Sequence, residues 1–414
     1  MRVGIIDADL LDHGTRHPNL ALMKISGYLK RYLKNIKRYH STVELVLDYG
    51  DLHKFDKLII SKVFTFSKLP DDLFFDNCKA KPATKLEQYT QASPKIIYGG
   101  TGFKYDGLEV PPNLPLSIER CMPDYSLYDA YVDREVNQLH KKACHYDDYK
   151  LYSIGFTTRG CFRRCSFCVN KHYDHVQIWS PIKEFLDKKR PYIYLWDDNF
   201  LGLGLATRQS DRKAGKKEPW EMILDELEAT GKPFQFRQGL DMRLMDEKIA
   251  ARLAKTRYHG DFIFAFDHYE QHKLIEKNLA IWRRHTNRPS KFYVLCGYDS
   301  IDEKDIEIIF KRIEILMRYA CLPYIMRYEN YKNSRYAGLY VQIARWCNQP
   351  QFFKKKSFRQ FCEANQFYHE KSSHKLPDCS AMRSLKLFES EHPEIAKRYF
   401  DMRYDELRGT WEKE

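Results

Sequence analysis

The chain has 414 residues, 43% of them hydrophobic, and is long enough for two or three domains that each bury a core. No stretch reaches the ~20 apolar residues that span a bilayer, and the N-terminus lacks the apolar region of a secretory signal, so we expect a cytoplasmic protein with no membrane partner. The 69 basic residues exceed the 56 acidic ones by 13, which favours an anionic partner such as nucleic acid.

Residues 1–125 predict an α/β domain with a doubly wound, Rossmann-like sheet. Apolar runs that are typical of strands lie at 3–7, 43–49, 57–64 and 95–100. A helix is expected over 20–33, because apolar residues recur there at a spacing near 3.6 and His17, Pro18 and Asn19 form a start signal. The segment 101–125 is expected to be an irregular connection.

Residues 126–335 predict six βα units. Their apolar runs lie at 152–157, 192–196, 234–238, 262–267, 292–297 and 322–327. Helical periodicity occurs between them at 180–189, 219–229, 245–255, 270–282 and 303–319. Six such units indicate a partial (βα)6 barrel, two units short of a closed one, with ligands at the carboxyl ends of its strands. Residues 336–414 predict a C-terminal helical cap.

Three of the eleven cysteines follow the first of these six strands. Clustered thiols in a reducing compartment indicate metal or redox chemistry. Cys161, Cys165 and Cys168 can hold three irons of a four-iron cluster and leave the fourth open. In an alternative interpretation, His172 or His175 completes a structural zinc site. A further alternative is that the cysteines are simply buried.

The cysteines stand as C-x3-C-x-F-C, with Phe167 as the aromatic residue. This spacing resembles the signature of the radical S-adenosylmethionine superfamily, which lies after the first strand of a partial (βα)6 barrel. The resemblance implies that Cys161, Cys165 and Cys168 hold a [4Fe-4S] cluster and that S-adenosylmethionine binds the fourth iron. It further implies that a one-electron reductant, such as a flavodoxin or ferredoxin, drives formation of a 5'-deoxyadenosyl radical. Phe167 is expected beside the adenine.

Polar residues at the next strand ends are candidates for binding S-adenosylmethionine. Asp197 and Asp198 follow the second strand and suit the methionine ammonium, with a helix cap or a turn as the alternative role. Arg237 and Gln238 end the third strand, where the Arg237 guanidinium suits a carboxylate or an internal ion pair. Asp267 ends the fourth strand, where a carboxylate can accept hydrogen bonds from the ribose hydroxyls.

The N-terminal domain resembles the cobalamin-binding domain that precedes many radical enzymes, with Gly99 and Gly100 as a loosely matching late turn. This resemblance implies cobalamin as a further cofactor. The histidine motif D-x-H-x-x-G is absent from its expected position, and the nearest string, Asp51-Leu52-His53, lies in a different loop. The alternative is therefore a retained scaffold without cobalamin.

These features predict a radical S-adenosylmethionine enzyme acting on a large anionic substrate, with nucleic acid preferred. A basic loop after the second strand can neutralise phosphates. Its cations are Arg208, Arg212, Lys213, Lys216 and Lys217. One alternative keeps the chemistry and places it on a peptide or small metabolite. Another is a non-catalytic, zinc-stabilised nucleic-acid-binding protein.

Overall fold

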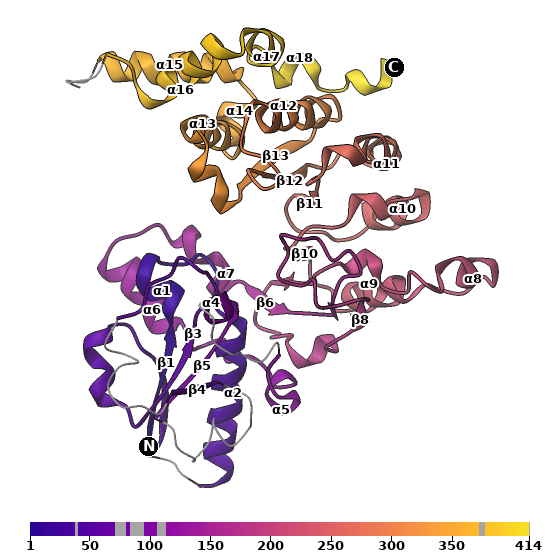
Figure 1. The fold of residues 1–414 in the computed structure, drawn as a ribbon. Coiled ribbons are helices and arrows are strands. Elements are labelled where there is room, and N and C mark those ends of the chain that lie inside the picture. Colours follow the sequence, from indigo (N-terminus) through magenta and orange to yellow (C-terminus); the bar gives the residue numbers. More distant parts are fainter. Residues whose placement is uncertain (38–39, 71–79, 83–94, 106–112, 372–376, 414) are drawn as a thin grey trace. The chain divides into compact units, whose positions relative to one another are not determined.

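The computed structural model describes residues 1–37, 40–70, 80–82, 95–105, 113–371 and 377–413. The chain divides into two compact units. Unit 1 comprises Met1–Thr157 and Trp179–Tyr194, and unit 2 comprises Thr158–Ile178 and Leu195–Glu414. The predicted α/β class with parallel sheets is confirmed (Figure 1).

Unit 1 contains a five-stranded parallel sheet in the order β2-β1-β3-β5-β4. Its strands are β1 Arg2–Asp7, β2 Thr42–Leu45, β3 Lys57–Ser61, β4 Ala80–Pro82 and β5 Ile96–Gly99. Strands β1 and β3 are buried along almost their whole length, as expected for parallel strands that are covered on both faces. The strand order reverses between β1 and β3, so their carboxyl ends form the switch point where such sheets bind ligands.

Helix α2, Leu20–Asn35, confirms the helix predicted from periodicity in unit 1. The Asn19 side chain caps it by accepting a hydrogen bond from the Leu22 N–H at 3.2 Å. Segment 101–125, expected to be irregular, contains two short helices in its described part. The other helical elements before β6 are α1 Ala8–His13, η1 Tyr49–Lys54, α4 Thr101–Tyr105, α5 Leu116–Glu119, α6 Asp129–Asp133, η3 Arg134–Gln138, η4 Ala143–Tyr146 and α7 Asp147–Lys150.

All six strands predicted for the central region are present. They are β6 Tyr152–Gly155, β9 Tyr192–Leu195, β10 Phe234–Phe236, β11 Phe262–Ala265, β12 Ser290–Cys296 and β13 Leu322–Arg327. They form two three-stranded sheets, β10-β9-β6 and β11-β12-β13. Isolated parallel bridges join Phe234 to Tyr258 and Leu240 to Phe264. The strands therefore follow one another in the order of the chain.

Four of the five helices predicted between these strands are present: α9 Pro219–Ala229, α10 Glu247–Ala254, α11 His272–His285 and α12 Glu303–Arg318. The prediction of a helix over 180–189 is wrong, because only the short 3-10 helix η5, Ile182–Glu184, forms there. The Tyr125 hydroxyl donates to the Phe185 carbonyl at 2.6 Å, and the Phe185 ring packs on Gly155. The hydrogen bond from Tyr125 occupies the Phe185 carbonyl, which in a longer helix would accept a backbone N–H of the following turn.

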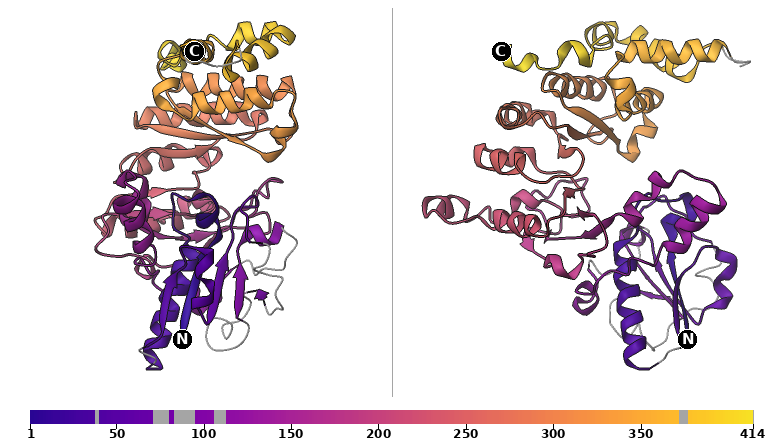
Figure 2. Two further views of the ribbon diagram at one scale, coloured as in Figure 1. Left: turned by 90° about the vertical axis from the view of Figure 1, so that its left-hand side faces the viewer. Right: turned by 180° about the vertical axis from the view of Figure 1, so that it is seen from behind.

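The described residues after β13 form helices, as predicted for the C-terminal region, and Figure 2 shows them in orange to yellow from two further sides. These helices are η9 Glu329–Asn333, α13 Ala337–Cys347, α14 Pro350–Phe353, α15 Phe358–Glu370, α16 Ser380–Glu391, α17 Pro393–Tyr399, α18 Tyr404–Leu407 and η10 Thr410–Lys413. Among all the described helices, none is both long enough and apolar enough to cross a membrane.

Candidate functional site

The three cysteines lie in a loop that is closed at its base. Strand β7, Thr158–Arg159, pairs antiparallel with β8, Gln177–Ile178. Gly160 opens the loop with a φ of +96°, and a Cβ there would lie 2.3 Å from the His175 carbonyl oxygen. Only glycine fits this position without strain.

The thiols of Cys161, Cys165 and Cys168 are all partly exposed. Burial raises the pKa of Cys165 and of Cys168, and the charge of Cys161 raises both further. The three sulfurs therefore lie within electrostatic range of one another. A metal that binds them must displace their protons.

Three N–H groups donate to two of these sulfurs. The backbone N–H groups of Arg163 and Asn170 donate to Cys161 Sγ and Cys168 Sγ respectively, each at 3.4 Å. The Asn199 side-chain Nδ2 also donates to Cys161 Sγ at 3.4 Å. Hydrogen bonds to sulfur are among the interactions that tune thiolate-bound iron-sulfur clusters, so this donor set fits such a cluster.

The two histidines expected in the zinc alternative are exposed and contact their own turns. His172 Nδ1 lies 3.2 Å from the Val169 carbonyl oxygen, and His175 Nδ1 contacts the Asp174 carboxylate. Among the described residues, no three His, Cys, Asp or Glu side chains converge on one metal-ion position. In a four-iron cluster each thiolate binds a different iron, so the sulfurs surround a volume rather than a single ion.

The two aspartates that follow β9 hold the cysteine loop. Asp197 is 2% exposed and accepts hydrogen bonds from the Thr158 N–H at 3.0 Å and the Thr158 hydroxyl at 2.9 Å. Asp198 accepts from the Gly160 N–H at 2.7 Å and from Asn170 Nδ2 at 2.6 Å. Gly160 and Asn170 flank the cysteines, so Asp198 ties together both ends of the cysteine-bearing segment.

A third carboxylate, Asp241, joins the cysteine loop to the segment after β10. It is 6% exposed and accepts from Arg163 Nε at 2.8 Å and from Arg243 Nε at 2.6 Å. Burial by itself would raise the pKa of Asp241, but the two arginines, led by Arg243, lower it below its ordinary value. Neither arginine was predicted as a site residue, although Arg163 stands between two cysteines.

Asn199, also missed, carries a buried acceptor. The residue is 4% exposed, and its Oδ1 has no hydrogen-bond partner within the described structure. Its Nδ2 faces two acceptors, Cys161 Sγ and the Asp241 carboxylate, both at 3.4 Å, which determines the orientation of the amide. An unsatisfied buried acceptor costs about 1–3 kcal/mol, which a ligand donor would relieve.

Phe167 meets the residues that follow β11 and β12. Its ring centroid lies 5.8 Å from that of His268 and 5.5 Å from that of Tyr298. Asp267 lines a cavity of about 70 Å³ together with His268, Tyr298 and other residues of these two strand ends. Burial raises the pKa of Asp267. Two of the predicted site residues, Phe167 and Asp267, therefore share the neighbours His268 and Tyr298.

Arg237 and Gln238 occupy the strand end after β10 as predicted. The backbone N–H of Arg237 donates to the Leu195 carbonyl at 2.7 Å, and its carbonyl accepts from the Tyr293 hydroxyl at 3.1 Å. The Gln238 side chain is exposed. These backbone contacts and this exposure do not indicate what the two side chains bind.

The basic loop uses three of its five cations in ion pairs within unit 2. Arg208 and Arg212 contact Glu218 at 3.0 and 2.6 Å, and Lys217 contacts Asp225 at 2.5 Å. Glu218 is fully buried. Although burial acts in the opposite direction, hydrogen bonds led by that of Arg212 lower the pKa of Glu218 to about 2. These cations hold their own loop together, which leaves less charge for phosphates.

Unit 1 exposes a cluster of rings at the carboxyl ends of β1 and β3. Asp9 shapes the loop there by accepting from the N–H groups of Val63 and Phe64 at 2.8 and 3.1 Å. Phe64 and Phe66 stack at 5.2 Å and are 44% and 62% exposed. The His13 ring lies 5.1 Å from that of Phe66. This cluster occupies the ligand-binding edge of the sheet.

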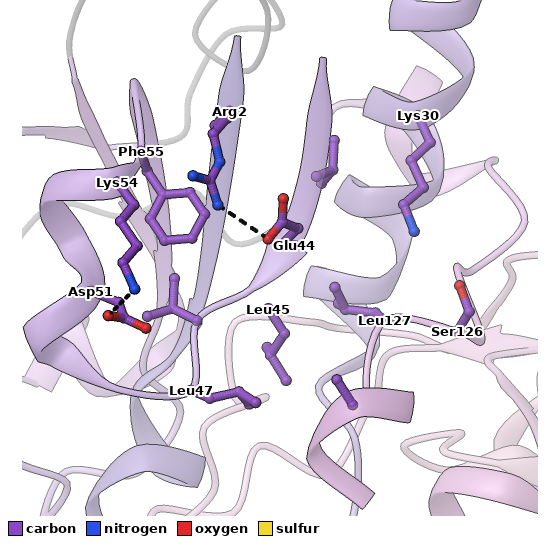
Figure 3. Close-up of a pocket in the computed structure, with 13 residues that line it drawn as sticks. Arg2, Lys30, Glu44, Leu45, Leu47, Asp51, Lys54, Phe55, Ser126 and Leu127 are labelled. Atoms are coloured by element: carbon purple, nitrogen blue, oxygen red, sulfur yellow. Dashed lines mark hydrogen bonds and ion pairs between the residues drawn. The ribbon is translucent and has the colours of Figure 1, made fainter. Parts of the chain in front are cut away.

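A cavity of about 460 Å³ in unit 1 lies beside the edge strand β2 (Figure 3), and His13, Phe64 and Phe66 are not among the residues that line it. Its apolar lining includes Leu45, Leu47, Phe55 and Leu127. Four of its charged residues pair with one another, Arg2 with Glu44 at 3.6 Å and Lys54 with Asp51 at 2.5 Å, and Lys30 pairs with Asp124 at 2.7 Å. None of the predicted site residues lines this cavity. His53 lies on η1 after β2, which places it in a different loop from the one where the cobalamin motif is expected.

No protein-family model and no curated protein matches the sequence. Two solved structures of the radical S-adenosylmethionine methyltransferase TsrM from Kitasatospora setae are similar to the chain, with TM-scores of 0.44 and 0.45 and 11% and 13% identity. They match 79% and 78% of this chain and 74% and 72% of that protein. The first holds cobalamin and a [4Fe-4S] cluster, and the second holds tryptophan substrate and an S-adenosylmethionine analogue.

The cobalamin-dependent S-adenosylmethionine radical enzyme OxsB is also similar, with a TM-score of 0.32 and 12% identity over 95% of this chain and 61% of that protein. That structure holds aqua-cobalamin and S-adenosylmethionine. All three similarities are low, with TM-scores below 0.5 and identities of 11–13%.

Proposed function

We propose that the chain is a radical S-adenosylmethionine enzyme in which Cys161, Cys165 and Cys168 hold a [4Fe-4S] cluster. The observation that carries this proposal is the closed loop of C-x3-C-x-F-C spacing whose sulfurs receive N–H donors. When bound, the cluster supplies one electron that cleaves S-adenosylmethionine to methionine and a 5'-deoxyadenosyl radical. The sequential strand order supports a partial (βα)6 barrel, with this loop following its first strand in the chain.

The proposed contacts to S-adenosylmethionine change in one respect from those expected from sequence. Asp197 and Asp198 already accept hydrogen bonds from protein donors. The orphaned Oδ1 of Asn199, on the residue that also contacts Cys161, is the better acceptor for the methionine ammonium. Phe167 and Asp267 remain the proposed neighbours of the adenosine, and Arg237 and Gln238 remain proposals for the carboxylate end.

Of the substrate classes considered, the ion pairs of the basic loop favour a small metabolite over nucleic acid. A polynucleotide is held mainly by cations that neutralise its phosphates. Arg208, Arg212 and Lys217 instead neutralise Glu218 and Asp225. The substrate is therefore proposed to be a small molecule.

A second cofactor, cobalamin, is proposed for the carboxyl ends of β1 and β3. The exposed rings of Phe64, Phe66 and His13 at this edge favour a ligand with a broad apolar face. Hydroxocobalamin should remain with the protein through gel filtration, with about one cobalt per chain, and Phe66→Ala should reduce this retention. Release of all cobalt from the unaltered protein would favour the scaffold without cobalamin.

The main proposal is tested by anaerobic reconstitution with iron and sulfide. About four irons per chain and 5'-deoxyadenosine formed with a flavodoxin or dithionite as reductant are expected. The triple variant Cys161→Ala, Cys165→Ala, Cys168→Ala should lose both, whereas Cys144→Ala, at an exposed cysteine of unit 1, should lose neither. A colourless protein that holds one zinc and forms no deoxyadenosine would establish the zinc alternative instead.

A further inference from the structure

The sheet β11-β12-β13 has one face covered by helices, and its other face is exposed only toward the carboxyl ends of β12 and β13, since Ile263 and Leu322 on that face are buried. Burial alternates along β12, so that Tyr293 and Leu295 are partly exposed between buried neighbours. The buried neighbour Phe292 packs on Phe264, and Phe264 contacts Trp282 of α11, at 5.2 and 5.5 Å between ring centroids. The buried set therefore faces the helices, and Tyr293 and Leu295 project from the other side.

Strand β13 extends this surface. The parallel register pairs Tyr293 with Tyr324 and Leu295 with Met326, and paired residues project from the same face. Tyr324 and Met326 are 39% and 44% exposed, and the rings of Tyr293 and Tyr324 lie 5.7 Å apart. We call these four residues the open face.

The dimensions of the open face follow from sheet geometry. Adjacent strands lie about 4.8 Å apart, and residues i and i+2 of one strand lie about 6.6 Å apart. Two paired positions on two strands therefore cover an area that matches one or two fused aromatic rings. Two of the four side chains are themselves aromatic, and stacked rings attract one another beyond the effect of the area they bury.

A path of rings connects the end of the open face with the cysteine loop. Tyr328, two residues after Met326, lies 4.7 Å from Tyr298 in an edge-to-face contact. Tyr298 lies 5.5 Å from Phe167, which stands between Cys165 and Cys168. The rings that follow β12 and β13 therefore lead from the strand ends of the open face to Phe167 in the cysteine loop.

The charges around the open face argue against a polyanion. None of its four side chains carries a formal charge at neutral pH. Lys291, which alternates onto the same side of β12, pairs with Asp261 at 3.5 Å. The four side chains themselves therefore offer rings and aliphatic groups rather than cations, and the guanidinium of Arg237 lies within electrostatic range of Tyr293.

We propose that the open face binds an uncharged planar aromatic group, of one or two fused rings, that belongs to a small-molecule substrate. The group stacks against Tyr293 and Tyr324, contacts Met326, and is presented next to the cysteine loop. This inference rests on the proposed function for the role of the loop, and it adds the chemical class of the substrate.

Indole serves as the probe, titrated into the reconstituted full-length protein and followed by ligand-observed NMR. Tyr324→Ala should weaken indole binding roughly tenfold, from the loss of one ring contact, whereas Tyr324→Phe should retain it. Met222→Ala is the matched control, because Met222 is 55% exposed on α9 and lies outside the open face. Cyclohexanol tests for simple apolar binding, and a 20-nucleotide RNA tests for nucleic acid.

Loss of indole binding in Tyr324→Ala, but not in Tyr324→Phe or Met222→Ala, would support the proposal. Equal binding of cyclohexanol and indole, or RNA binding that Tyr324→Ala abolishes, would overturn it. So would indole binding that is unchanged in Tyr324→Ala. If indole binds through Tyr324 but no deoxyadenosine forms on reduction, the aromatic site stands and the radical chemistry fails, so the two failures are distinguishable.

Discussion

Two buried carboxylates, Asp7 of unit 1 and Asp241 of unit 2, have pKa values that move in opposite directions. Asp7, 2% exposed at the end of β1, accepts from the Tyr128 hydroxyl at 2.7 Å and lies near the like charge of Asp9. Burial raises the pKa of Asp7 to about 7. Asp241 is 6% exposed, but Arg243 and Arg163 lower its pKa. Burial alone therefore does not decide whether a carboxylate stays charged, because its partners determine the sign.

Among the variants that test this comparison, Asp7→Asn is expected to change the free energy of unfolding most. Because the folded-state pKa is raised from 3.8 to about 7, the stability contributed by neutral Asp7 is full below pH ~4 and is lost as the pH rises through 7. Asparagine keeps an acceptor for Tyr128 and cannot ionise. The variant should match the unaltered protein near pH 4 and be more stable by up to ~4 kcal/mol at pH 8, measured by urea denaturation.

Asp12→Asn, at an exposed position of the helix α1 that follows Asp7, is the control, because it removes a carboxylate that is not buried. A stability difference for Asp7→Asn that is the same at pH 4 and pH 8 would contradict the raised pKa of Asp7.

The second variant, Asp241→Asn, should lower the stability of the protein, whereas Asp7→Asn should raise it. Asp241→Asn removes the negative charge shared by Arg163 and Arg243, and breaking such a largely buried pair should destabilise the protein by about 3 kcal/mol at pH 7. Iron retention after reconstitution should fall as well, because Arg163 lies within the cysteine loop. Asp225→Asn, which removes the more exposed ion pairs with Lys217 and Arg252, is the control. Equal losses of stability in the two variants would show that Asp241 is no special anchor.

A smaller effect concerns the midpoint potential of the cluster. Asn199→Leu keeps a similar volume but removes the N–H donor to Cys161 Sγ. Loss of a hydrogen bond worth about 1 kcal/mol should lower the potential by about 40 mV, measured by redox titration followed by electron paramagnetic resonance. Asn170→Leu keeps its backbone N–H donor to Cys168 and should shift the potential less. Equal shifts in both variants would argue against a specific role of the Asn199 amide.

The smallest effect is expected in the basic loop. Lys217→Ala removes the exposed pair with Asp225 and should change stability by no more than about 0.5 kcal/mol. Retention of RNA on the protein at low salt should also stay unchanged, because Lys217 is proposed to have no phosphate to neutralise. A clear loss of RNA retention in this variant would restore nucleic acid as the substrate class.

Features that depend on local periodicity and spacing were predictable from the sequence. The strands of the central region stand as short apolar runs, and helix α2, with its Asn19 cap, has apolar residues spaced near 3.6, so a short window contains the whole signal. The helix expected over 180–189 failed because a tertiary contact, from the Tyr125 hydroxyl to the Phe185 carbonyl, overrode the local pattern. The domain boundaries at 125 and 335 remain predictions.

The sequence by itself determined the cysteine triplet and its place after a strand, since ligand spacing is a property of eight consecutive residues. Only the tertiary structure decided which charges are available around it. Arg163 meets Asp241 across 78 residues, and Asp197 and Asp198 are occupied by donors from the cysteine loop. Such pairings depend on which strand ends the fold brings together, and no local pattern encodes them.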